Sequence, residues 1–76
     1  MDYKKISNRE LQVLRLAALE NGEIANILNI GKTTVKQYFE RAFVKLGVTN
    51  RRQAIIKVLR LGLMKPEQFI VGYTKE

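Results

Sequence analysis

The segment 32–46 carries five side chains, four of them polar, at a spacing that places them on one face of a helix. They are Thr33, Lys36, Gln37, Glu40 and Val44. Lysine can donate to guanine or to phosphate, glutamine can pair with adenine, and glutamate can accept from cytosine. Recognition of DNA bases is therefore the chemistry that this face could perform. A solvent-facing helix that binds nothing would show the same pattern.

The residue types that usually carry out catalysis or hold metals are scarce. The chain has neither Cys nor His, which excludes disulfides, zinc–thiolate sites and the commonest general base. Glu20 and Glu23 are the nearest paired carboxylates, and we interpret them as ordinary charges at a helix end. No G-x-x-x-x-G-K phosphate loop is present. We expect no enzyme activity, no cofactor, no metal and no small-molecule ligand.

The charge balance points to a polyanionic partner. Fourteen Lys and Arg residues face seven Asp and Glu residues, for a net charge of +7 and a pI of about 10.1 over 76 residues. Nucleic acid and anionic membrane are both partners that fit such a balance. Ribosomal or structural proteins can be equally basic. The longest nearly apolar stretch, residues 59–64, is far too short to span a bilayer. We expect a soluble cytoplasmic protein that does not bind membranes and that associates with the nucleoid when bound to DNA.

The first predicted helix has a complete start signal. Ser7 and Glu10 form an S-x-x-E capping box, and Ile6 and Leu11 are placed as a hydrophobic staple. The predicted apolar face comprises Leu11, Val13, Leu14, Ala17 and Ala18. Asn21-Gly22 is expected to end this helix.

Three more helices follow at short intervals. The second is predicted at about 23–28, and the link 29–31, which contains a glycine, separates it from the third at about 32–46. Two helices joined by so short a link are typical of a helix-turn-helix. The apolar positions of the third helix repeat with a helical period: Val35, Phe39, Ala42, Phe43 and Leu46.

Glycines mark the ends of the last two helices. Gly47 is expected to stop the third helix. Thr49 or Asn50 can cap a fourth helix at about 51–61, and Gly62 is its expected stop. Pro66 then opens the tail. The predicted fold class is all-α, with four helices.

Five segments of the chain resemble the LuxR/GerE-type helix-turn-helix family, the DNA-binding module of many bacterial response regulators and quorum-sensing receptors. They occur in the family's order: 7–14 (SNRELQVL), 23–25 (EIA), 34–36 (TVK), 45–48 (KLGV) and 51–54 (RRQA). The resemblance implies a four-helix fold of the winged-helix-like DNA-binding superfamily, without a wing. It divides the chain into an N-terminal extension (1–5), a helix-turn-helix domain (6–63) and a C-terminal tail (64–76).

The resemblance also implies roles for individual residues. The third helix enters the major groove, with Lys36 and Gln37 at the family's reading positions. The residues expected to read bases are Lys32, Thr33, Lys36, Gln37 and Glu40. Those expected to contact phosphate are Thr34, Tyr38, Arg41, Lys45, Arg51 and Arg52. For Thr34 and Arg51 the family offers a second role, which is support of the motif's backbone.

Departures from the family concern the reading helix and the link before it. Gly31 replaces the usual Ser or Thr cap, at a cost of only a few tenths of a kcal/mol. Tyr38 replaces a His, and Glu40 stands where several relatives carry Lys or a neutral residue. The link 19–22 is shorter than usual, which leaves the start of the second helix open.

The fourth helix is apolar on more than one side. Ala54, Ile55 and Val58 are assigned to the core. The second stripe is predicted to form a two-fold dimer interface that comprises Ile56, Leu59, Arg60 and Leu63. The alternative cover for this stripe is the tail, through Phe69, Ile70, Val71 and Tyr73.

These observations predict a dimeric bacterial transcriptional regulator that binds double-stranded DNA in a sequence-specific manner. The alternative is a protein-interaction module of the same fold that docks on RNA polymerase or on another regulator. A docking surface is expected to show aromatic and apolar anchors. The polar face of the third helix lacks them, which favours DNA.

Overall fold

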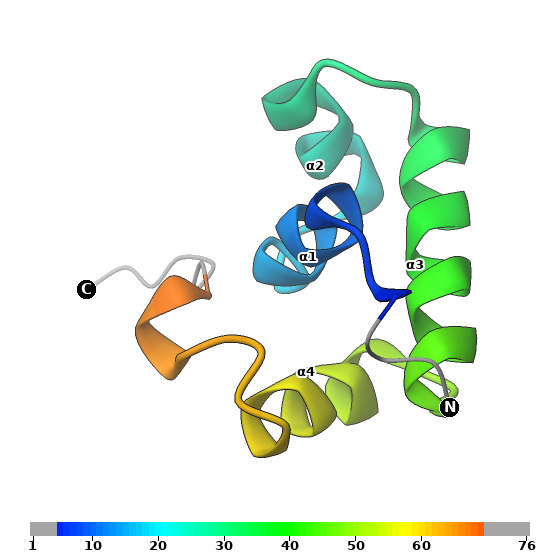
Figure 1. Cartoon of the computed structure of the whole chain (residues 1–76). Helices are drawn as coiled ribbons and strands as arrows, with labels where there is room; N and C mark the ends of the chain where they lie inside the picture. The colour runs from blue at the N-terminus through cyan, green and yellow to red at the C-terminus, as the bar shows by residue number, and fades with distance from the viewer. Residues whose placement is uncertain (1–4, 70–76) are drawn as a thin grey trace.

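The computed structural model describes residues 5–69, which form four α-helices and one short 3₁₀ helix (Figure 1). The helices are α1 (Asn8–Arg15), α2 (Asn21–Leu28), α3 (Lys32–Leu46), α4 (Arg51–Arg60) and η2 (Pro66–Gln68). No strand occurs within residues 5–69, which confirms the predicted all-α class. In the same range no helix has the length and apolar character that crossing a membrane would require.

The capping box at the start of α1 is confirmed. The Glu10 amide donates to Ser7 Oγ at 3.1 Å, and the Ser7 amide donates to Glu10 Oε1 at 2.9 Å. The end of α1 differs from the prediction, because the helix stops at Arg15 instead of reaching Asn21-Gly22. After it, the amides of Leu16, Ala17 and Leu19 each donate to the carbonyl three residues earlier, which is the hydrogen-bond pattern of a 3₁₀ turn. As a result Ala18 is exposed and does not belong to the apolar face.

The second helix begins two residues earlier than predicted, at Asn21. Glu20 is its N-cap residue in an extended conformation, and the Glu20 amide donates to the Glu23 carboxylate at 3.0 Å. Asn21-Gly22 therefore forms the first turn of α2 and does not act as a stop. The paired carboxylates serve a helix end, as the sequence indicated.

The link between α2 and α3 has the predicted position and length. Asn29 adopts a left-handed conformation (φ 57°, ψ 48°), and the Ile30 amide donates to the Ala25 carbonyl at 3.0 Å. This arrangement is a common helix stop that satisfies carbonyls at the end of the helix. Helix α3 then runs over the predicted range to Leu46, and its C-cap residue is Gly47, whose φ of 72° suits glycine.

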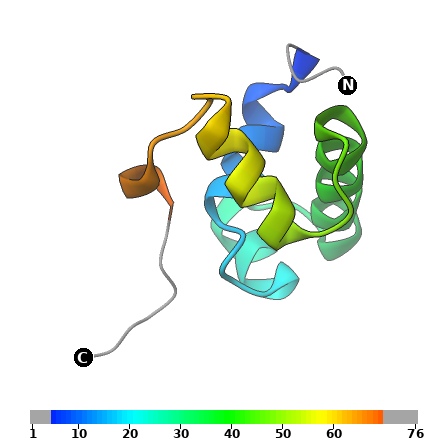
Figure 2. The same cartoon turned by 90° about the horizontal axis from the view of Figure 1, so that it is seen from below.

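Of the two candidate caps for α4, Asn50 is the one used, because its side chain accepts from the Gln53 amide at 2.9 Å. Helix α4 ends at Arg60, and Gly62 follows in a left-handed conformation (φ 72°). The chain then turns back toward α1, so that η2 lies on the side of the molecule away from α3 (Figures 1 and 2).

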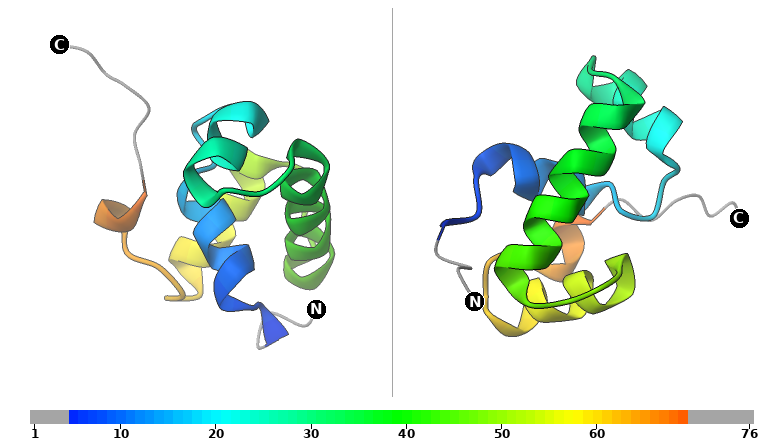
Figure 3. Two further views of the ribbon diagram at one scale, coloured as in Figure 1. Left: turned by 90° about the horizontal axis from the view of Figure 1, so that it is seen from above. Right: turned by 90° about the vertical axis from the view of Figure 1, so that its right-hand side faces the viewer.

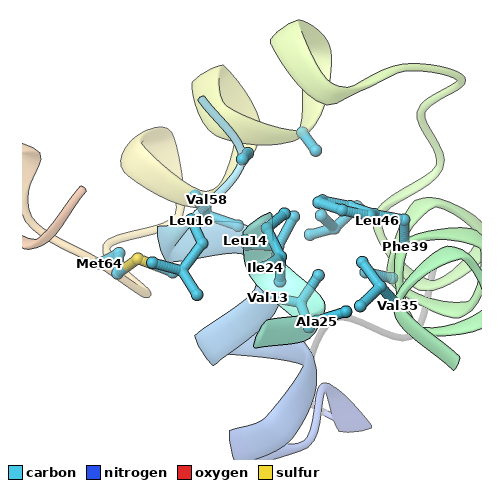
Figure 4. Packing of buried hydrophobic residues seen from close by; sticks show 13 residues of the cluster. Val13, Leu14, Leu16, Ile24, Ala25, Val35, Phe39, Leu46, Val58 and Met64 are labelled. Carbon is cyan, nitrogen blue, oxygen red and sulfur yellow. The ribbon is translucent and has the colours of Figure 1, made fainter. Parts of the chain in front are cut away.

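A single hydrophobic core joins the four helices. Helix α1 lies at its centre, with α2, α3 and α4 around it (Figure 1). The buried apolar side chains, shown in Figure 4, are Val13, Leu14, Leu16, Ala17, Ile24, Ala25, Val35, Phe39, Ala42, Leu46, Ala54, Val58 and Met64. The inner face of α3 is thus fully used by the core, and its opposite face is left to solvent.

Candidate nucleic-acid interface

The outer face of α3 brings together all five residues that the sequence predicted to read bases. Lys32, Thr33, Lys36, Gln37 and Glu40 are exposed, whereas Val35, Phe39, Ala42 and Leu46 of the same helix are buried. The right panel of Figure 3 looks onto this helix, which lies in front of the rest of the domain. An uncovered helix of 15 residues has the form that enters a major groove.

The N-terminus of α3 carries no side-chain cap. Gly31 is the N-cap residue, with an extended backbone and no side-chain hydrogen bond. A Cβ at this position would lie 3.9 Å from Thr34 Oγ1, which is ordinary van der Waals contact. The space around Gly31 would therefore accept the family's serine.

The residues predicted to contact phosphate fall into two groups. Arg41 and Arg52 are exposed and available to a ligand, and the Arg41 guanidinium lies 5.8 Å from the centre of the Tyr38 ring. Tyr38 and Thr34 are half-buried, and Tyr38 packs against the core. Tyr38 therefore fills space between the middle of α3 and the core.

Lys45 is held by the protein itself. Its Nζ lies 2.8 and 3.0 Å from the two carboxylate oxygens of Glu10, and it also donates to the Lys5 carbonyl at 3.0 Å. Glu10 is only 3% exposed. The ammonium group of Lys45 thus joins α3 to the start of α1, an arrangement that does not favour the predicted phosphate contact.

The Glu10–Lys45 pair sets the charge state of Glu10. Burial alone would raise the pKa of the Glu10 carboxyl, but the ammonium group of Lys45 and the hydrogen bonds from Ser7 outweigh burial. The pKa therefore lies below the ordinary glutamate value, and Glu10 is ionised at neutral pH. Within residues 5–69 this is the one salt bridge, so the exposed cations of α3 have no acidic partner there.

Arg51, at the start of α4, is also engaged internally. One terminal nitrogen donates to the carbonyls of Ala17 and Leu19, at 3.1 and 2.7 Å, and the other donates to Asn21 Oδ1. The guanidinium carbon lies 4.0 Å from the centre of the Phe39 ring. Of the two roles that the family offers for Arg51, the contacts match support of the backbone and not phosphate binding. Burial lowers the pKa of Arg51, although arginine remains charged at working pH.

The predicted second stripe of α4 is smaller than expected. Ile56 is 49% exposed, Leu59 is half-buried and Arg60 is exposed. Leu63 instead packs partly against the core, because the chain turns inward after Gly62. Among the tail residues considered as a cover for this stripe, Phe69 packs against the core. Ile70, Val71 and Tyr73 lie outside the described residues.

Sequence reasoning missed that Glu10 connects helices, and it offered a supporting role for Arg51 only through the family resemblance, without its partners. Glu10 was predicted only as a capping residue, and its partner Lys45 lies 35 positions away. The Arg51 partners lie 30 to 34 positions away. No local spacing rule links residues so far apart. No metal-binding group of His, Cys, Asp or Glu occurs in the described part of the chain.

Comparison with known proteins gives one consistent family. The sequence model described as "GerE: Bacterial regulatory proteins, luxR family" matches residues 4–58. The chain is 44% identical over 63 residues to the transcriptional activator protein VanR of Vibrio anguillarum, and 44% identical over 67 residues to the transcriptional activator protein EsaR of Pantoea stewartii subsp. stewartii. It is 41% identical over 61 residues to the quorum sensing-dependent transcriptional regulator VjbR of Brucella abortus (strain 2308).

These matches cover most of the chain but a minor part of each relative. They include 80%, 86% and 78% of the chain for the Vibrio, Pantoea and Brucella proteins, respectively. The corresponding shares of the relatives are 26%, 27% and 24%. The chain thus spans about a quarter of the length of these relatives.

Proposed function

Since the chain belongs to the luxR family of bacterial regulatory proteins, we propose that it binds double-stranded DNA as a homodimeric transcriptional regulator. In this proposal α3 lies in the major groove and reads sequence. The protein acts in the bacterial cytoplasm and associates with the nucleoid when it is bound to DNA. The same matches support the prediction that it is not an enzyme, because the relatives are named as transcriptional activators and regulators.

The observation that carries the proposal is the division of α3 into two faces. Its inner face is buried in the core, and its outer face presents lysine, threonine, glutamine and glutamate to solvent. Val44, 77% exposed, is the one large apolar side chain on the outer face among the described residues. A surface that docks on a protein would need more apolar anchors than this, so DNA is favoured over the RNA polymerase or regulator alternative.

The side chains have complementary roles in the proposed complex. Lys36 donates to guanine or phosphate, Gln37 pairs with adenine and Glu40 accepts from a cytosine amino group. Lys32 and Thr33 contact bases at the helix start. The DNA phosphates are contacted by the exposed Arg41 and Arg52, together with Thr34 and Tyr38. Because the Glu40 carboxylate repels phosphate, the target sequence is expected to differ from those of relatives that carry Lys at this position.

The salt dependence of DNA binding tests the proposal. The logarithm of the binding constant should fall linearly with the logarithm of the salt concentration, by about 0.9 for each phosphate neutralised. Fluorescence anisotropy with a labelled duplex between low and moderate ionic strength measures this slope. Affinity that does not change with salt would contradict the proposal.

Single substitutions in α3 should separate base reading from general attraction to DNA. Lys36→Ala and Gln37→Ala are each expected to weaken binding to the specific site by about 1–3 kcal/mol and to spare non-specific binding. The specific site is first obtained by sequencing DNA that the purified protein selects from a random pool. Lys65→Ala is the matched control, because it removes the same charge from an exposed position away from α3. Equal losses for Lys36→Ala and Lys65→Ala would refute the assignment.

Dimerisation is proposed to use α4, through the exposed side of Ile56, Leu59 and Arg60. A symmetric pair implies an inverted-repeat site with half-sites about 10–10.5 bp apart. Leu59→Lys should place a charge in the apolar contact and separate the subunits, with each subunit still folded. Analytical ultracentrifugation measures this, and Ala18→Lys, an equal charge at an exposed position outside α4, should leave the dimer intact.

Two outcomes would contradict the proposed dimer. The first is a wild-type protein that remains monomeric at high micromolar concentration, with or without operator DNA. The second is a Leu59→Lys variant that unfolds by circular dichroism, which would assign Leu59 to the core of its own subunit.

A further inference from the structure

A shallow apolar groove lies between α1 and α2. Its volume is about 240 Å³, and it is lined by Gln12, Arg15, Leu16, Ile27 and Leu28. Ile27 is 58% exposed, although it belongs to a short helix whose other face is buried. Leu16, which forms one wall, lies on the side of the core away from α3 (Figure 4). The groove is therefore separate from the proposed DNA-binding face.

The described chain ends at the rim of this groove. Met64 is buried and lies beside Leu16 (Figure 4). Four residues later, the Gln68 carbonyl accepts a hydrogen bond from Arg15 Nε at 3.0 Å, and Phe69 packs against the core. Arg15 thus both holds the end of η2 and lines the groove.

The sequence that follows has the composition to fill an apolar groove. Residues 70–73 read Ile-Val-Gly-Tyr, and the charged residues Lys75 and Glu76 come only after them. Four extended residues reach about 13 Å, more than the 8–10 Å that separates the axes of two packed helices. The segment is long enough to cross from α1 to α2.

We propose that residues 70–73 bind in the α1–α2 groove of the same chain, with their apolar side chains against Ile27 and Leu28. The occupant is intramolecular because the Arg15–Gln68 hydrogen bond and the packing of Phe69 hold its start at the rim. Tethering gives such a segment a high effective concentration over any free ligand. The bound segment connects α2, the first helix of the helix-turn-helix, to α1. This inference goes beyond the proposed function and does not depend on it.

Cysteine cross-linking tests the inference directly, because the chain contains no cysteine of its own. The full-length double variant Ile27→Cys/Val71→Cys should form an intrachain disulfide under mild oxidation at least ten times faster than Val44→Cys/Val71→Cys. Val44 is the control because it is an exposed β-branched residue on α3, outside both the groove and the proposed dimer interface. Electrophoresis without reductant separates intrachain products from covalent dimers. Equal rates for the two variants would overturn the inference, as would a product made only of covalent dimers.

A second measurement keeps the inference falsifiable if the cysteine variants do not fold. The methyl resonances of Ile27 are followed by NMR in the full-length protein, with Ile70→Ser/Val71→Ser as the test variant. We expect the Ile27 methyl signals to shift and those of Ile56 to remain in place. An unchanged Ile27 signal would overturn the inference. Both measurements are made without DNA, so their outcome is independent of whether the protein binds DNA as proposed.

Discussion

Replacing Arg51 with alanine should lower the free energy of unfolding by about 3 kcal/mol, because the carbonyls of Ala17 and Leu19 lose a charged donor. The cation–π contact with the Phe39 ring is lost as well. Together these contacts connect the α1–α2 link, α4 and the reading helix α3. Urea denaturation followed by circular dichroism measures the change.

Arg52 is the matched control for Arg51, since it is the exposed neighbour on the same helix turn. Arg52→Ala should leave stability within about 0.5 kcal/mol of wild type and weaken binding to all DNA sequences alike. Arg51→Lys should keep the charge but recover little of the lost stability, because an ammonium group cannot reproduce the forked contacts of a guanidinium. If Arg51→Ala were as stable as wild type and only weakened DNA binding, the phosphate role would be correct and the support role wrong.

Removing the Glu10 side chain should also lower the free energy of unfolding by a large amount. Glu10→Ala should cost about 3–5 kcal/mol, the usual range when one member of a buried ion pair is deleted. The Lys45 ammonium group would lose its partner, and the Ser7 amide would lose its acceptor. Glu10→Gln should cost less, because the amide oxygen can still accept from Ser7. Thermal and urea denaturation compare the variants.

The double variant Glu10→Gln/Lys45→Met tests whether the cost arises from the unpaired charge. Removing both charges should recover part of the stability that Glu10→Gln loses, since no uncompensated ammonium group then remains. Single and double variants form a double-mutant cycle that isolates the interaction. Purely additive effects would show that Glu10 and Lys45 do not act as a pair.

The Glu10–Lys45 pair also predicts the response of stability to acid. Because the folded pKa of Glu10 lies below its unfolded value, the stabilisation is present at neutral pH and is lost as the pH falls through the folded pKa. Stability measured at decreasing pH should therefore fall more steeply for wild type than for Glu10→Gln. Parallel curves would contradict this assignment.

Much of the helical arrangement was readable from local signals. The Ser7–Glu10 capping box, the link 29–31 and the stop at Gly47 are where the sequence placed them, and α3 has the predicted bounds. The five motif segments predicted the family that the comparisons confirm. The local signals failed at the α1–α2 link, where Asn21-Gly22 has the composition of a stop but starts a helix. Glu20 is the N-cap there although Glu is not favoured at that position, and Glu23 completes the start from the third helical position.

The sequence by itself determined where the polar face of α3 lies, because the period of 3.6 residues separates apolar from polar positions within one helix. Only the tertiary structure decided which cations remain free on the surface. Lys45 and Arg51 are held by partners 30 to 40 positions away, whereas Arg41 and Arg52 stay exposed. Local spacing describes one helix at a time. The partners of a charged side chain depend on which helices pack together, and that is set by the whole core.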